Sequence, residues 1–252
     1  MLLVIDVGNT NINLGVVEGK RLLERFVIPT AQESYSKQLK QIFLRYAADR
    51  AIICSVVPQV VGRLKAGLSP FLTAKALVVG EDFPVPIKNC YRKPAQVGQD
   101  RLVNAFAGVL TCQAPLVVVD FGTAITFDVI SARQEYLGGI IVPGLNISLD
   151  ALADRAALLP RIKLEHPKEF IGRDTQNSIL SGLIHGMAAL VDEIVDRINK
   201  EIGNKGVVIF TGGDAALISG YCRQRHKLDP DLTLKGLTML WFYHYQKNQK
   251  NS

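Results

Sequence analysis

An aspartate–glycine motif closes an apolar run near the start of the chain and returns in shorter form 114 residues later. The first copy is DVGNT at residues 6–10, after the run LLVIDV, and the second is DFGT at residues 120–123, after PLVVVDF. A second apolar stretch follows each copy at once, as in a β-hairpin: NINLGVV in one case and ITFDVI in the other. Echoes this short also arise by chance, but two copies of one strand–turn–strand unit favour a chain built from two related halves.

The rest of the chain alternates between strand-like and helix-like patterns. Short aliphatic runs bounded by Gly, Pro or Asp predict further strands at residues 50–57, 138–144 and 206–213. The clearest helical pattern is Ser178–Ile202, where apolar side chains recur every three or four positions and Gly203 follows. Buried-type strands and amphipathic helices together predict α/β layers, with helices covering a sheet.

Composition and charge restrict the kind of protein. The chain has 252 residues, of which 48% are hydrophobic and 21% charged, which is typical of an ordinary globular protein of one large or two modest domains. The net charge of +6 suits an anionic partner, but the basic residues are scattered and the aromatic residues at 241–245 form a separate cluster. We therefore expect no binding of nucleic acid.

The cysteines and the start of the chain indicate a cytoplasmic protein. The four cysteines lie far apart, without the spacing of a zinc site, and are expected to be reduced. The first apolar run follows no basic segment and is interrupted by Asp6, so it is too short for a signal peptide or a membrane span. We expect no association with a membrane.

The two aspartate–glycine motifs have a use in phosphate chemistry. Glycine lets the backbone approach an anion closely, exposed N–H groups and Thr or Asn side chains are donors, and an aspartate can hold a cation. A single such motif is more often a simple tight turn. Two copies at equivalent strand ends favour phosphate binding, and the absence of GxxxxGK[ST] excludes a Walker-type site.

Three other segments are candidates for substrate contacts. Gly212-Gly213, directly after an apolar run, would let adenine or ribose lie against the backbone, although Gly-Gly-Asp is also a common turn. Asp100 and Arg101 precede a helical pattern, where Asp100 can accept a hydroxyl proton and Arg101 can bind a carboxylate; the alternative is a helix-capping Asp with a solvated Arg. Thr175, ahead of the long helix, either caps that helix or reaches a pocket.

These segments, in this order, resemble the type III pantothenate kinases of bacteria, from the superfamily of acetate kinase, sugar kinases, actin and the heat-shock chaperone ATPases. The resemblance runs nearly from end to end and is most specific in GQDR, DFGTAIT and GGIIVPG. It implies an α/β fold of two ribonuclease-H-like halves, each a mixed sheet flanked by helices, at residues 1–114 and 115–252. The first half would carry the first phosphate motif, and the second half the second phosphate motif and the adenosine motif.

The resemblance also implies an activity: ATP-dependent phosphorylation of pantothenate to 4′-phosphopantothenate, the first step of coenzyme A biosynthesis. Mg²⁺ would accompany ATP, and K⁺ or NH₄⁺ would be required. The protein would be a homodimer, with the apolar segment at residues 144–160 as a subunit contact or, alternatively, as part of the core.

Site residues follow by matching motifs. Asp100 would be the general base, Asp120 would bind the monovalent cation, and Asp6 would also hold Mg²⁺. The ATP contacts would be Asp6, Val7, Gly8, Asn9, Thr10, Asn11, Ile12, Asn13 and Thr123. Pantothenate would contact Tyr91, Gly98, Gln99, Asp100, Arg101 and Thr175. One departure is Lys93, where many members have Asn, at the rim of the pocket.

Two rival functions remain open. Another kinase of the same superfamily, acting on a sugar, a carboxylate or another small alcohol, would have similar phosphate hairpins, and GQDR argues against it. A nucleotide-binding regulator without catalysis would share the fold; the presence of Asp6, Asp100 and Asp120 argues against this alternative.

Overall fold

The computed structural model describes residues 1–203 and 205–250, with side chains up to residue 245, and the chain forms two compact units. The first unit contains residues 1–87 and 92–107 together with the C-terminal segment that begins at Leu232. The second contains residues 88–91 and 108–231. The predicted boundary between residues 114 and 115 follows the sequence repeat. The compact units differ from these two halves, because the C-terminal segment from Leu232 belongs to the first unit and residues 88–91 belong to the second.

The first unit is built on a five-stranded mixed sheet in the order β3-β2-β1-β4-β5. The strands β1, β2 and β3 form an antiparallel meander, and β4 and β5 continue the sheet in parallel on the other side of β1. The strand bounds are β1 Leu2–Val7, β2 Asn11–Glu18, β3 Arg21–Pro29, β4 Arg50–Ser55 and β5 Leu77–Val78.

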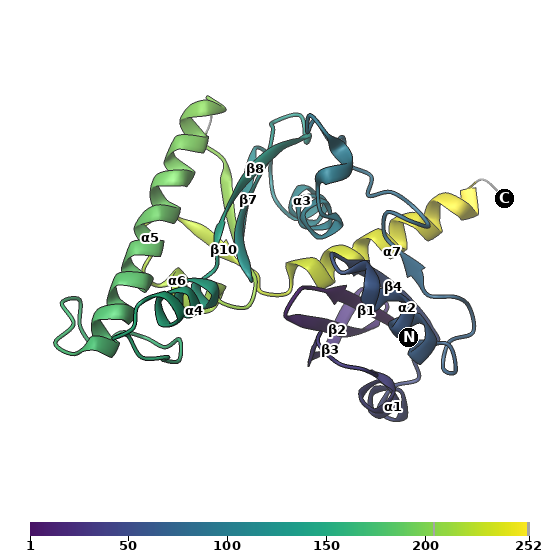
Figure 1. The fold of residues 1–252 in the computed structure, drawn as a ribbon. Coiled ribbons are helices and arrows are strands. Elements are labelled where there is room, and N and C mark those ends of the chain that lie inside the picture. Colours follow the sequence, from purple (N-terminus) through teal and green to yellow (C-terminus); the bar gives the residue numbers. More distant parts are fainter. Residues whose placement is uncertain (204, 251–252) are drawn as a thin grey trace. The chain divides into compact units, whose positions relative to one another are not determined.

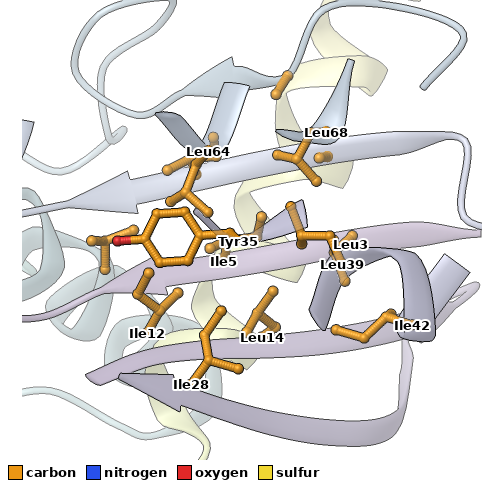
Figure 2. Packing of buried hydrophobic residues seen from close by; sticks show 14 of the residues in the cluster. Leu3, Ile5, Ile12, Leu14, Ile28, Tyr35, Leu39, Ile42, Leu64 and Leu68 are labelled. Atoms are coloured by element: carbon orange, nitrogen blue, oxygen red, sulfur yellow. The ribbon is translucent and has the colours of Figure 1, made fainter. Parts of the chain in front are cut away.

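Helices cover both faces of this sheet. The helices α1 (Ser36–Arg45) and α2 (Pro58–Leu68) pack on the face that presents Leu3 and Ile5, and Figure 2 shows the buried Tyr35 ring among these aliphatic side chains. The long C-terminal helix α7 (Leu232–Lys250) packs against β1, β2 and β4. A Cβ at Gly15 of β2 would lie 3.4 Å from Leu234 of α7, on the face of the sheet opposite to the one that presents Leu3 and Ile5. The central strands β1 and β4 are therefore buried on both sides, which explains their nearly continuous apolar runs.

The second unit repeats this arrangement with the strand order β10-β9-β6-β7-β8. Here β6, β7 and β8 form the antiparallel meander, and β9 and β10 run parallel to β6. The bounds are β6 Leu116–Phe121, β7 Ala124–Ile130, β8 Tyr136–Pro143, β9 Val207–Thr211 and β10 His226–Leu228. The same topology in both units supports the interpretation that the two motifs belong to one repeated hairpin.

The helices of the second unit include the longest in the chain, α5 (Thr175–Glu201), drawn in green in Figure 1. One face of α5 packs on the sheet together with α6 (Ala215–Ser219) and the start of α4 (Leu145–Arg155). By length and composition α5 could also cross a membrane, but its packing is that of a core helix. As predicted, it ends next to Gly203, which adopts a positive φ of 67°.

The remaining helices lead into the candidate site. The short 3₁₀ turn η1 (Pro94–Gln96) precedes α3 (Gln99–Thr111), so Asp100 and Arg101 lie in the first turn of a helix, as predicted. The strands and α-helices that the sequence patterns did not predict are β3, β5, β10, α1, α2, α4, α6 and α7.

A buried carboxylate fixes one connection of the second unit. Asp192 of α5 is 2% exposed, and its oxygens accept hydrogen bonds from the backbone N–H groups of Arg223 and Gln224 at 2.9–3.0 Å and from Nε of Arg223 at 3.1 Å. The loop between α6 and β10 therefore depends on Asp192 for its backbone partners.

We expect Asp192→Ala to lower the free energy of unfolding by about 2 kcal/mol, because buried N–H groups lose their acceptor. Urea unfolding followed by circular dichroism measures this loss. The control is Glu193→Ala, which removes only an exposed pair with Arg197 and should cost less than about 0.5 kcal/mol. Equal losses in the two variants would contradict the assigned role of Asp192.

Candidate active site

The first phosphate motif forms the turn between β1 and β2. Asp6 and Asn13 are cross-strand partners at the end of the ladder, and Gly8 N–H donates to Asn11 O at 3.0 Å to close the turn. A side chain at position 8 would meet Asn11 O at 3.1 Å, so glycine suits this tight approach. The three turn residues Asn9, Thr10 and Asn11 are exposed. The turn therefore presents polar groups beside a carboxylate.

A threonine after β3 braces this turn. Thr30 is buried, its Oγ1 donates to Gly8 O at 2.7 Å, and its N–H donates to Thr10 O at 2.9 Å. The hydroxyl of the buried Tyr35 donates in turn to Thr30 O at 2.6 Å. Sequence reasoning missed Thr30 and Tyr35, since nothing local links them to a turn some 20 residues away.

The carboxylate of Asp6 is held from the side of β2. Asn13 Nδ2 lies 3.5 Å from Asp6 Oδ2, and Arg25 on β3 donates from Nη2 to Asn13 Oδ1 at 2.9 Å. The amide of Asn13 is oriented by this pair of contacts, with its oxygen toward Arg25 and its nitrogen toward Asp6.

Asp6 and the predicted base Asp100 both belong to the first unit, and both carboxylates act on the thiol of Cys54. Both raise the pKa of the Cys54 thiol, although burial of the thiol is the larger cause. Cys54 is fully buried on β4, directly opposite Asp6 in the parallel register. A buried thiol thus feels the charge of two carboxylates that belong to different predicted motifs.

Burial sets the proton affinity of Asp100. Removal from water raises the pKa of this carboxyl group, and the N–H and guanidinium of Arg101 oppose that rise only in part. The N–H of Arg101 donates to Asp100 Oδ1 at 2.9 Å. A carboxylate with a raised pKa at a helix N-terminus is suited to accept a proton from a hydroxyl group.

The neighbours of Asp100 are closely packed. A Cβ at Gly98 would lie 2.4 Å from Asp100 Oδ1, so the carboxylate needs the bare backbone there. Gln99 packs its amide against Gly80, where a Cβ would be 2.8 Å away. Arg101 is only 9% exposed. The structure therefore brings together Gly98, Asp100 and Arg101 as predicted, whereas the Gln99 side chain contacts the protein's own loop.

The second motif is a tighter turn in the second unit. Gly122 N–H donates to Ala124 O at 3.2 Å, and Asp120, the residue before the last of β6, pairs with Thr126 of β7 and Thr211 of β9. Thr123 is exposed. Asp120 thus occupies the position in this sheet that Asp6 occupies in the first.

Two glycine loops close around the second motif. Gly212, with a φ of 94°, lies so near the motif that a Cβ would be 2.4 Å from Asp120 Oδ1 and 2.6 Å from Phe121 O. A Cβ at Gly144 would be 2.4 Å from the carbonyl oxygens of both Gly122 and Thr123. Only glycine allows these approaches, and they gather carbonyl and carboxylate oxygens, the ligands that K⁺ and Mg²⁺ prefer.

Asp214 and Asn146 link the loop after β9 to the start of α4, next to the second motif. Asp214 N–H donates to Phe121 O at 3.1 Å, and Asn146 Nδ2 donates to Asp214 Oδ2 at 3.2 Å. Burial raises the pKa of Asp214, and the bond from Asn146 lowers it. The predicted adenosine motif at residues 211–214 is thereby fixed against the second phosphate motif.

The remaining predicted substrate residues, Tyr91 and Thr175, belong to the second unit. Tyr91 packs its ring along Gly138 of β8, where a Cβ would be 3.3 Å from Tyr91 Cδ2. Thr175 is the exposed first residue of α5, and Asp174, not Thr175, is the N-cap, accepting from Asn177 N at 2.7 Å. The alternative that Thr175 caps the helix is therefore wrong.

The described residues contain no group of three or more His, Cys, Asp or Glu side chains arranged to hold a metal ion.

Comparison with known families identifies relatives over the whole length. A family model described as type III pantothenate kinase matches residues 2–197. A type III pantothenate kinase of Pelobacter propionicus is 43% identical over 258 residues, covering 99% of this chain and 100% of the relative. Another, from Desulforapulum autotrophicum, is 43% identical and covers 95% and 96% of the two chains.

Solved structures with the same fold are more distant in sequence. Component A of (R)-2-hydroxyglutaryl-CoA dehydratase from Acidaminococcus fermentans has a TM-score of 0.56 and 14% identity, covering 98% of each chain. The ROK hexokinase from Thermus thermophilus has a TM-score of 0.50 and 15% identity, covering 98% of this chain and 99% of the hexokinase. These likenesses confirm the predicted fold, two mixed sheets flanked by helices as in actin-like ATPases and sugar kinases.

The raised pKa of Asp100 predicts how the stability of the protein changes with pH. The pKa of the Asp100 carboxyl is higher in the folded chain than in the unfolded chain, where it is about 3.9. Its ionisation therefore lowers the free energy of unfolding as the pH rises above the unfolded pKa, and the loss is complete once the pH exceeds the folded pKa. Asp100→Asn removes the charge, and its Oδ1 can still accept the N–H of Arg101. We expect this variant to be more stable than the parent protein at pH 7 and equal to it below pH ~3.5.

Urea unfolding at several pH values measures this difference. Asp82→Asn is the matched control. Lys75 and the N–H of Val78 lower the pKa of the Asp82 carboxyl, so removing this carboxylate should destabilise the protein at pH 7. A loss of stability in Asp100→Asn at pH 7 would contradict the burial penalty.

Proposed function

The chain belongs to the type III pantothenate kinase family, and we propose that it transfers the γ-phosphoryl group of ATP to the terminal hydroxyl of pantothenate with Asp100 as the general base. It is a kinase by this membership. The product would be 4′-phosphopantothenate, in the first step of coenzyme A biosynthesis. The observation that best supports the role of Asp100 is its partial burial in the first turn of α3, which raises the pKa of its carboxyl group.

The chemical step is an in-line displacement. The pantothenate hydroxyl oxygen forms a bond to the γ-phosphorus as the bond to the β–γ bridging oxygen breaks, and ADP leaves. Asp100 accepts the hydroxyl proton, and the fixed N–H of Arg101 keeps the receiving carboxylate in place. Since phosphoryl transfer needs little covalent help, orientation of the two substrates carries most of the rate enhancement.

We assign phosphate binding to the two turns. Asp6, Val7, Gly8, Asn9, Thr10, Asn11, Ile12 and Asn13 would contact ATP from the first turn, and Thr123 from the second. The bracing of the first turn by Thr30 and the polar character of its exposed residues support this role. Mg²⁺ bound with ATP would neutralise phosphate charge, and Asp6 would hold it.

The acceptor pocket would be lined by Tyr91, Gly98, Gln99, Asp100, Arg101 and Thr175. Among these, Arg101 would bind the pantothenate carboxylate, because a buried guanidinium recognises a carboxylate in a two-pronged geometry.

A monovalent cation would complete the second motif. Asp120 Oδ1 and Phe121 O both converge on Gly212, which leaves an oxygen-rich cradle without a side chain. We propose that Asp120 binds K⁺ or NH₄⁺ there and that the cation offsets negative charge near the nucleotide.

We expect the purified protein to phosphorylate pantothenate only when ATP, Mg²⁺ and either K⁺ or NH₄⁺ are present. Asp100→Asn should lower kcat by about 10²–10⁴-fold, since a positioned base contributes this much. A coupled ADP-release assay measures both effects, with circular dichroism as the check on folding. Full activity of Asp100→Asn would exclude this base, and failure of the parent protein to phosphorylate pantothenate with both cations supplied would favour another acceptor or a regulator.

The protein is also proposed to act as a cytoplasmic homodimer. Exposed apolar side chains gather on α4 and the chain that follows it: Ile147 at 43%, Leu152 at 40%, Leu158 at 94%, Phe170 at 71% and Ile171 at 78% exposure. A second copy covering this surface would remove them from water.

We expect sedimentation equilibrium to give about twice the chain mass of 27.6 kDa. A Leu158→Asp, Phe170→Asp double variant should give the monomer mass, because two charges would be buried in the interface. The matched control is Leu44→Asp, another exposed leucine, in the first unit. A monomeric parent protein would contradict the proposal.

A further inference from the structure

The second unit contains a fully buried carboxylate, Asp128, that has no role in the reaction described above. Asp128 of β7 is fully buried, as is Tyr136 at the start of β8. The Tyr136 hydroxyl donates to Asp128 Oδ1 at 2.8 Å, and Thr126 Oγ1 donates to Asp128 Oδ2 at 3.2 Å. A buried carboxylate is costly unless its oxygens are bonded, so this group has a fixed orientation.

A β-bulge places Tyr136 on the same face of the sheet as Asp128. Regular pairing would continue from Val129↔Gly138 to Ile130↔Leu137, but the register shifts and Ile130 pairs with Tyr136 instead. Gly138, at a φ of 137°, adopts the backbone conformation that this irregularity requires. Without the extra residue, Tyr136 would point to the opposite face.

The backbone of Tyr136 holds the segment that carries Tyr91. Tyr136 N–H donates to Lys88 O at 2.9 Å, and Cys90 N–H donates to Tyr136 O at 2.8 Å, so the segment pairs with Tyr136 as an isolated parallel bridge. An exposed ion pair between Lys88 and Glu135 adds a weaker contact. All these contacts of the Tyr91 segment are made to Tyr136 and to Glu135, the residue before it.

Tyr91 itself is positioned by two further contacts. Its N–H donates to Asn89 Oδ1 at 3.0 Å, and its ring lies along the bare backbone of Gly138, two residues after Tyr136. The same short stretch of β8 thus supplies the backbone partner, the bulge and the surface for the Tyr91 ring.

The polar side chains extend to the second phosphate motif. Asp120 and Thr126 are cross-strand partners, and Thr126 bonds to Asp128. Partners of this kind project from the same face of a sheet with their Cβ atoms about 5 Å apart. One face of the second sheet therefore carries a row of polar groups from Asp120 to the residue that holds the Tyr91 segment.

We propose that Asp128 and Tyr136 form an anchor that positions Tyr91 for the phosphoryl acceptor. The inference rests on the proposed function, which assigns Tyr91 to the pantothenate pocket. Both are positioning residues: Asp128 fixes the Tyr136 ring, and Tyr136 fixes residues 88–91 through its backbone. Loss of the anchor loosens this segment and weakens acceptor binding without changing the nucleotide contacts.

The test is Tyr136→Phe, which keeps the ring and removes only the hydroxyl that bonds Asp128. Hydrogen–deuterium exchange of peptides that cover residues 88–91 should become about five- to tenfold faster, as for the loss of one buried hydrogen bond. The KM for pantothenate should rise by a similar factor, and the KM for ATP should stay within about twofold of the parent value.

Two further variants separate anchoring from general destabilisation. Tyr221→Phe removes a phenol hydroxyl that contacts His166 Nδ1 at 3.0 Å in the same unit, and should change neither readout. Asp128→Ala removes both acceptor oxygens, including the one that the Tyr136 hydroxyl bonds, and should reproduce the effects of Tyr136→Phe.

Unchanged exchange of residues 88–91 in Tyr136→Phe would overturn the anchor. Faster exchange with an unchanged KM for pantothenate, or an equal rise in both KM values, would overturn its role in acceptor binding. If the parent protein does not phosphorylate pantothenate, the proposed function fails and with it the assignment to this acceptor, while the exchange experiment still decides whether the anchor exists.

Discussion

The central strand of each sheet is buried on both faces except at an aspartate next to its last residue, and the candidate site depends on this constraint. Residues 3–5 of β1 and 117–119 of β6 have no exposed surface, whereas Asp6 and Asp120 are only partly buried. Polar side chains are excluded from such a strand until its end, because a buried polar group without partners is costly. Each strand thus presents its carboxylate at one edge of its sheet.

The neighbours of the central strand complete that edge. On one side a hairpin returns at once and brings Asn13 or Thr126 opposite the aspartate; on the other a parallel strand brings Cys54 or Thr211. The carboxyl ends of parallel strands meet at the same edge, so the loops that follow β4 and β9 arrive there too. This explains why Gly212, directly after Thr211, packs against Asp120 even though the two motifs lie about 90 residues apart in the sequence.

Local patterns predicted the parts of the fold whose signals are contiguous. Both hairpins, the start of α3 and the long helix α5 follow from apolar runs, glycine breaks and helical periodicity, and the structure confirms them. The strand β3 was missed because it is an edge strand whose side chains alternate between exposed and partly buried and include Arg21, Glu24 and Arg25. The C-terminal helix α7 was missed because its apolar residues lie on several sides, and the aromatic cluster within it was noticed only as a possible contact for nucleic acid.

Sequence reasoning also could not supply the residues that support the motifs. Thr30 reaches Gly8 across 22 positions, and Tyr136 takes the segment at residues 88–91 as its backbone partner. Such contacts depend on which strands pair and in which register, and a shift of one residue reverses the face of every side chain. The bulge that turns Tyr136 toward Asp128 is the clearest case, since unbroken alternation would have placed Tyr136 on the other face.

In both units a buried tyrosine links the core to a loop of the candidate site. The Tyr35 ring is packed in the first core, and its hydroxyl bonds Thr30, which braces the first phosphate turn. The Tyr136 ring is equally buried, and its hydroxyl bonds Asp128 while its backbone holds the Tyr91 segment. A phenol suits this task because its ring has few rotatable bonds to order and its hydroxyl lies far from the backbone. The loops of the candidate site are thus held in place by the Tyr35 and Tyr136 rings, which the close packing of the interior fixes.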